Sequence, residues 1–137
     1  MLMNGSHQAQ INECLQELQD THPIHGLILV SYDGLLLAST FERSAPVERV
    51  SALTSAVYLL AGEILQVMAH DDEVESVEVQ YKSHSDDHTT DHIVIKPVGT
   101  GAILAVIERI PPRYSIPPRW AFWSEIDLAI EYLENLV

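Results

Sequence analysis

The stretch ERVSALTSAVYLLAGEILQVM, residues 48–68, decides the fold of this chain. Its apolar residues recur at alternating steps of three and four, which places their side chains on one face of an α-helix. The stretch therefore predicts a long helix. The stripe that we expect to face a core consists of Val50, Leu53, Val57, Leu60, Ile64 and Val67.

The opposite side of this helix lacks the charged residues that a surface helix normally presents to water. It carries small or apolar residues, with Gln66 as the only strongly polar neighbour. A chain of this size can place only one layer on each side of a helix. We therefore expect this second face to contact another copy of the protein or a different partner. The face consists of Ser51, Ser55, Tyr58, Leu59, Gly62 and Leu65.

Length and cysteine content indicate one domain in a reducing compartment. A chain of 137 residues can bury well over half of its unfolded surface in one core. Cys14 is the single cysteine, so no intramolecular disulfide can form. The N-terminus lacks the basic and apolar regions of a signal peptide, and no apolar run approaches the ~20 residues that span a bilayer. We therefore expect a cytoplasmic protein.

The charge balance argues against two classes of partner. Seven Lys and Arg against 20 Asp and Glu give a formal net charge of −13. Such a charge repels the phosphate backbone of nucleic acids and anionic lipid headgroups at long range. We expect no nucleic-acid partner and no direct membrane insertion.

The segments before the long helix predict a short helix and a β-hairpin. Ile11, Leu15 and Leu18 lie at helical spacing in an amphipathic segment that ends before Pro23. The apolar runs 27–32 and 35–40 are joined by Asp33-Gly34. This residue pair readily adopts the positive φ angles of a tight turn, so the two runs form a hairpin.

Three more strands are predicted after the long helix. Val77 and Val79 alternate with polar residues, which is typical of a strand with one wet face near the edge of a sheet. Residues 92–98 form the next strand, and the unbroken apolar run 102–107 predicts a central strand buried on both faces. The fold class is therefore α+β, an antiparallel sheet flanked by helices.

The composition of the chain changes after residue 110. Ile-Pro-Pro-Arg occurs at 110–113 and again at 116–119, and the proline pairs favour polyproline geometry. A final helix follows, with Ile126, Ile130, Leu133 and Val137 on one stripe. This helix starts either at the capping-box pattern that begins at Ser124 or with Pro118 as its first helical residue. We predict a main domain over 6–110 and a segment, 111–137, docked on it.

This order of elements resembles the roadblock/dynein light chain family, in its bacterial and archaeal GTPase-regulator type. The resemblance covers roughly residues 11–107. It rests on the hairpin around Asp33-Gly34, the Ala- and Leu-rich helix 48–68 and the stretch PVGTGAILAV at 97–106. It implies a five-stranded antiparallel sheet between helices, in the order α-β-β-α-β-β-β-α of roadblock, longin and profilin folds.

The resemblance also implies a partner and an interface. Members of this family dimerise through the long helix and the strand after it, and typically bind or regulate small Ras-like GTPases. Carried over, the dimer interface comprises the second face of the helix together with Val77 and Val79. If an arginine finger is supplied to a GTPase, Arg43 and Arg49 near the start of the helix are the first candidates.

Motifs for chemistry are missing from the sequence. Gly99-Thr100-Gly101 lacks the Gly-Lys-Ser/Thr ending of a phosphate-binding loop, and no serine stands in a nucleophile elbow. Cys14 lies on the inner stripe of the first helix, which favours a buried small residue over a reactive thiol. We expect no catalytic residue, no enzymatic activity and no cofactor.

Two polar segments are open to a functional interpretation. His84, His88 and His92 lie among aspartates and include metal-ligand types, but an acidic stretch between strands is typical of a solvated loop, so we expect no metal site. The cations of the proline-rich segment are interleaved with aromatic residues, as at protein interfaces. This segment is either a recognition arm or a spacer laid on its own acidic domain. Its candidate contacts are Arg113, Tyr114, Arg119 and Trp120.

Together these features predict a non-enzymatic homodimer that binds and regulates a small Ras-like GTPase. The first alternative is a scaffold or motor-adaptor subunit without effect on GTP hydrolysis. The second is a sensor domain for a small molecule or a metal.

Overall fold

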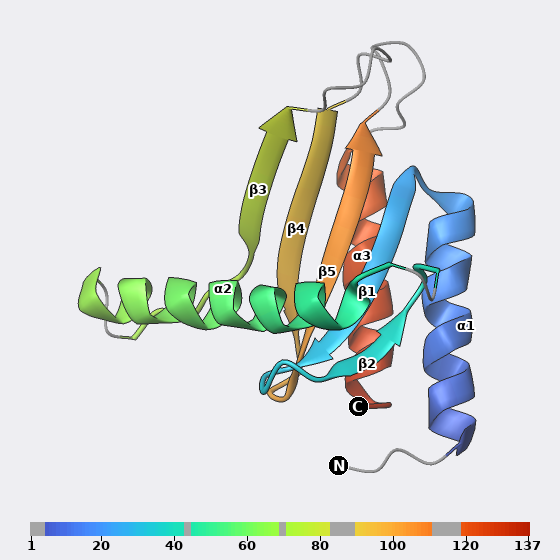
Figure 1. Ribbon diagram of the computed structural model, residues 1–137, viewed down its shortest axis with the longest axis horizontal. Coiled ribbons are helices and arrows are strands. Elements are labelled where there is room, and N and C mark those ends of the chain that lie inside the picture. Colours follow the sequence, from blue (N-terminus) through green and yellow to red (C-terminus); the bar gives the residue numbers. More distant parts are fainter. Residues whose placement is uncertain (1–4, 43–44, 69–70, 83–89, 111–118) are drawn as a thin grey trace.

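The computed structural model describes residues 5–42, 45–68, 71–82, 90–110 and 119–137 (Figure 1). Helices and strands follow each other in the predicted order. Their bounds are α1 Gly5–Thr21, β1 Ile24–Ser31, β2 Leu36–Ser39, α2 Val47–Met68, β3 Val77–Lys82, β4 Thr90–Val98, β5 Ala102–Ile110 and α3 Arg119–Glu134.

Among the described residues, five strands form one antiparallel sheet in the order β2-β1-β5-β4-β3. Helix α2 lies across one face of this sheet, and α1 and α3 cover the other (Figure 1). The α+β fold expected from the sequence is confirmed. So are the position of β3 at an edge and the central position of β5.

Strand β5 contributes buried side chains to the hydrophobic core on both faces of the sheet. Leu104 and Val106 pack with residues of α1 and α3, whereas Ile103 and Ala105 belong to the cluster beneath α2. Residues 102–106 are all buried, as the apolar run predicts. Because successive side chains of a strand point to opposite faces, a strand buried on both sides must be apolar throughout.

Helix α3 completes the layer opposite α2. Its stripe is buried at Ile126, Ile130 and Leu133, beside Ile11 and Leu15 of α1. The helix begins at Arg119, so Ser124 lies within the helix and the capping-box start is wrong.

Helix α2 faces the sheet with the side opposite to the one predicted. Ser51, Thr54 and Ser55 are its buried residues. Of the stripe expected to face the core, Val50 alone packs against the cluster beneath α2. The other five side chains are between 40% and 83% exposed: Leu53, Val57, Leu60, Ile64 and Val67. The core-facing stripe in our sequence interpretation is therefore wrong.

The physical reason is a close approach between α2 and the hairpin. A Cβ added at Gly34 would lie 3.4 Å from the Cα of Ala52, so the two backbones nearly touch. The Ser55 hydroxyl donates a hydrogen bond of 2.5 Å to the carbonyl of Tyr32. The Ser51 hydroxyl donates at 2.8 Å to the carbonyl of Val47 within the helix. Only small side chains with satisfied polar atoms fit at this distance.

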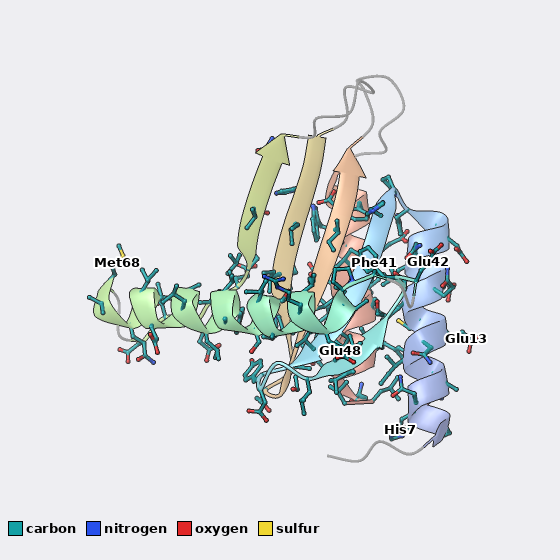
Figure 2. All side chains as sticks on the ribbon, in the orientation of Figure 1. His7, Glu13, Phe41, Glu42, Glu48 and Met68 are labelled. Atoms are coloured by element: carbon teal, nitrogen blue, oxygen red, sulfur yellow. The ribbon has the colours of Figure 1, made fainter. Side chains whose placement is uncertain are left out.

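The C-terminal half of α2 extends past the edge strand β3 (Figure 1). The most extensive contacts of α2 with the sheet are to β1 and β2. Met68 stands exposed at the far end (Figure 2). By length and composition α2 reaches the requirement for a membrane span, contrary to our expectation, because its 22 residues include an 18-residue window of mean hydropathy 1.5. Its polar N-terminal half nevertheless packs on the sheet.

Gly34 should be intolerant of any side chain. Its φ of 88° lies in the left-handed region, which costs an L-residue about 1–2 kcal/mol. We expect Gly34→Ala to lower the free energy of unfolding by about this amount, measured by urea denaturation. Gly101→Ala is the matched control, because nothing lies within 4 Å of an added Cβ there. An equal loss of unfolding free energy in both variants would show that the positive φ of Gly34 is not what limits substitution there.

Candidate functional site: the surfaces of the long helix

The structure divides the predicted dimer interface into two groups. Ser51 and Ser55 are buried within their own chain, Ser55 against the hairpin, so they are not part of the exposed surface of the helix. The remaining residues are partly or largely exposed: Tyr58, Leu59, Gly62 and Leu65 on α2, and Val77 and Val79 on β3. Whether they form an interface stays a prediction.

A groove of about 590 Å³ lies beneath the overhanging half of α2. Tyr58, Gly62 and Leu65 line it from the helix. The segment that leads to β3, the end of β4 and the turn that follows it form the other walls, with Val74 and Pro97 among their residues. Nothing lies within 4 Å of a Cβ added at Gly62, so the groove is open at that point.

Two tyrosines close the inner end of this groove. The ring centroids of Tyr32 and Tyr58 lie 5.8 Å apart. The Tyr58 hydroxyl donates a long hydrogen bond of 3.4 Å to the carbonyl of Val74. Burial and the neighbouring Tyr32 raise the pKa of Tyr58 to about 12, so its phenol is neutral at physiological pH. The two rings make the inner end of the groove partly apolar, while Glu63, Asp72 and Glu73 also line the groove.

The side of α2 that points away from the sheet is an apolar surface. We call its members, Leu53, Val57, Leu60, Ile64 and Val67, the outer stripe. They follow one another at helical spacing, so they form one continuous strip. Single exposed apolar residues are ordinary, but a continuous strip marks an interaction site. Periodicity found this strip and assigned it to the wrong side.

The candidate partner contacts are only partly placed. Arg49 is exposed in the first turns of α2. Arg43, Arg113 and Tyr114 lie outside the described residues. Arg119 and Trp120 begin α3, and the structure does not describe their side chains.

The histidine cluster is likewise divided. His84 and His88 lie outside the described residues, whereas His92 belongs to β4. His92 Nδ1 lies 3.2 Å from a carboxylate oxygen of Glu108, which is buried on β5. In the described ranges no three metal-ligand side chains are grouped around a common point. The sequence did not reveal the pairing of Glu108 with His92, because only the register between β4 and β5 places the two residues opposite each other.

The chain belongs to the Roadblock/LC7 domain family, whose model matches residues 10–108. No curated protein matches it by sequence.

Solved structures with the same fold include two proteins named MglB. Myxococcus xanthus MglB is 18% identical, with 100% of this chain and 97% of that chain covered, at a TM-score of 0.73. The gliding protein MglB from Thermus thermophilus is 13% identical, with 99% and 94% covered, at a TM-score of 0.75. A Roadblock/LC7 domain from Streptomyces avermitilis is 19% identical, with 90% and 94% covered, at a TM-score of 0.72. At these identities the likeness shows the fold alone.

The orientation of α2 can be tested with two neighbouring residues. Ser55 is buried against the hairpin and Ala56 is exposed. We expect Ser55→Leu to overpack the contact and lower the free energy of unfolding by about 1–3 kcal/mol, whereas Ala56→Leu changes it by less than about 0.5 kcal/mol. Denaturant titrations of both variants measure this difference. A larger loss for Ala56→Leu would mean that the faces are assigned the wrong way round.

Proposed function

We propose that this chain forms a homodimer that binds and regulates a small Ras-like GTPase without chemistry of its own. The observation that supports the proposal is the uncovered apolar surface of α2, which lies both on the outer stripe and in the groove beneath the overhang. Apolar area of this kind gains free energy when a partner removes it from water.

Two features favour a second copy as the partner beneath the overhang. Strand β3 pairs only with β4 among the described strands, so its outer edge offers free backbone groups to another strand. If two copies join their β3 edges about a two-fold axis, each overhanging helix reaches over the partner's sheet. Tyr58, Leu59, Gly62 and Leu65 then meet the other copy, with Val77 and Val79 at the joined edges.

The outer stripe is the proposed surface for the GTPase. It lies on the side of α2 away from the sheet, so joining the β3 edges leaves it accessible. Arg49, at the N-terminal end of the same helix, supplies a positive charge beside it in a strongly acidic chain. Membership of the roadblock family supports a GTPase as the partner. Regulation requires that the domain bind one nucleotide state more tightly than the other.

The proposal includes a cytoplasmic setting, with no cofactor and no catalytic residue. Arg43 and Arg49 are the first residues to test as arginine fingers, because a guanidinium group stabilises the charge that develops on the transferred phosphoryl group. In either case the chemistry belongs to the GTPase.

The dimer can be tested at Gly62. A Cβ added at this position has no described atom within 4 Å, and Leu is a better helix former than glycine, so the fold should tolerate Gly62→Leu. In the dimer the added side chain fills space that the partner occupies, which weakens association by about 1–3 kcal/mol. We expect light scattering over a dilution series to report a dimer for the unmodified protein and monomer at higher concentrations for Gly62→Leu.

Ala56→Leu is the control for this test, because it adds the same side chain to an exposed position of the same helix. It should leave the dimer intact. A monomeric unmodified protein, or an unchanged dimer in Gly62→Leu, would refute the proposed interface.

The GTPase can be tested by capture from a cell lysate. The tagged protein should recover a small GTPase with a clear preference for either GDP or a GTP analogue, identified by mass spectrometry. Leu60→Lys with Ile64→Lys should abolish recovery, because the two charges interrupt the outer stripe. Leu35→Lys is the control, since it changes an exposed leucine outside α2 that lines neither the groove beneath the overhang nor the groove between α1 and α3. Equal recovery in both nucleotide states would argue for the scaffold instead.

A further inference from the structure

A second groove lies on the opposite side of the molecule, between α1 and α3. It has a volume of about 560 Å³, and the described residues that line it belong to these two helices. The α1 residues that line it run from Gln10 to Thr21, a length of about 17 Å at a helical rise of 1.5 Å per residue. A segment of about three helical turns fits this length.

The floor and one wall of this groove are apolar. Leu18, Ala129 and the half-buried Cys14 form the floor. Leu128 and Tyr132 stand one helical turn apart on α3 and are 64% and 46% exposed. Burial, with a smaller contribution from the carboxylate of Glu17, raises the pKa of the Cys14 thiol, so the floor carries no charge at neutral pH. A partner must therefore bring apolar side chains.

The rim of the groove is acidic. Glu13 and Glu17 lie one turn apart on α1, and Glu13 points away from the sheet (Figure 2). Glu125 faces them from α3, where His22 Nε2 lies 2.6 Å from its carboxylate. Among the described residues that line the groove there is no Lys or Arg. Like charges one turn apart on a helix are destabilising in the free protein, and a cationic partner would relieve their repulsion.

We propose that the groove between α1 and α3 binds a basic amphipathic helix of a partner protein. The apolar face of that helix packs against Leu128 and Tyr132, and its flanking Lys or Arg side chains pair with Glu13, Glu17 and Glu125. This is the helix-in-groove mode of recognition, with charge complementarity selecting the partner.

The location of the groove gives the binding a consequence for function. It lies on the face of the sheet opposite α2, so a helix bound there leaves the outer stripe and the β3 edge free. The domain then holds two proteins at once, one on each face. The proposal for this groove does not depend on the proposed GTPase partner. Experiments can refute either proposal without affecting the other.

The probe is a synthetic amphipathic peptide of roughly 18 residues, long enough to form helix in water. It carries Leu at helical spacing on one face, Lys and Arg on the flanks and Ala elsewhere. A second peptide has Glu in place of each cation. Cys14 is the only cysteine and lines the groove, so its rate of reaction with a maleimide reports occupancy at this position. We expect the basic peptide to slow this reaction and the acidic peptide to leave it unchanged.

Paired variants separate the groove from the overall charge. Glu13→Lys with Glu17→Lys should weaken binding of the basic peptide at least ~10-fold by calorimetry. Glu63→Lys with Asp71→Lys makes the same change in net charge at exposed positions outside the groove, and should leave the affinity within about twofold. Leu128→Ala with Tyr132→Ala should also weaken binding ~10-fold at unchanged charge.

Several results would overturn the proposal. Equal weakening by the two charge-reversed pairs would show that the peptide senses only net charge. Full reactivity of Cys14 at saturating peptide would place the peptide elsewhere, for instance on the outer stripe. Protection of Cys14 that rises with protein concentration without peptide would mean that a second copy occupies the groove.

Discussion

The close approach of α2 to the β1–β2 hairpin is the constraint on which the rest of the surface depends. The backbones at Gly34 and Ala52 nearly touch, and this proximity admits only small residues such as Ala52 and Ser55. The large apolar residues of α2 therefore cannot face the sheet near its start. They remain on the outside, where none of the described residues buries them, and this exposure is the reason that we propose the helix as a binding surface.

Strand β5 connects the hydrophobic clusters on the two faces of the sheet. Its side chains contribute alternately to the cluster beneath α2 and to the cluster shared with α1 and α3. One face of the sheet thus supports an exposed apolar helix, and the other supports a helix pair with an acidic groove between them. The two surfaces differ in chemistry, so we expect them to bind different classes of partner: an apolar surface on one side and a basic amphipathic segment on the other.

Much of the fold could be predicted because its signals are local. Asp33-Gly34 marks a turn by its backbone preferences, and the run 102–107 marks a strand buried on both faces by the absence of polar residues. The candidate functional site was harder to predict from the sequence. Helix 48–68 is apolar on two sides, so periodicity defines the two stripes but not which of them faces the sheet. The pairing of His92 with Glu108 depends on strand register, which spacing along the chain does not contain.

The sequence by itself determined the order of the elements, the family and the presence of more apolar helix surface than one small domain can cover. Those properties follow from the residue types within each segment. Only the tertiary structure decided which face of α2 is buried, how far α2 extends past β3, and that Glu13 and Glu17 share a groove with Leu128 and Tyr132. These features depend on distances between segments far apart in the chain, and such distances are set by how side chains pack when the segments meet.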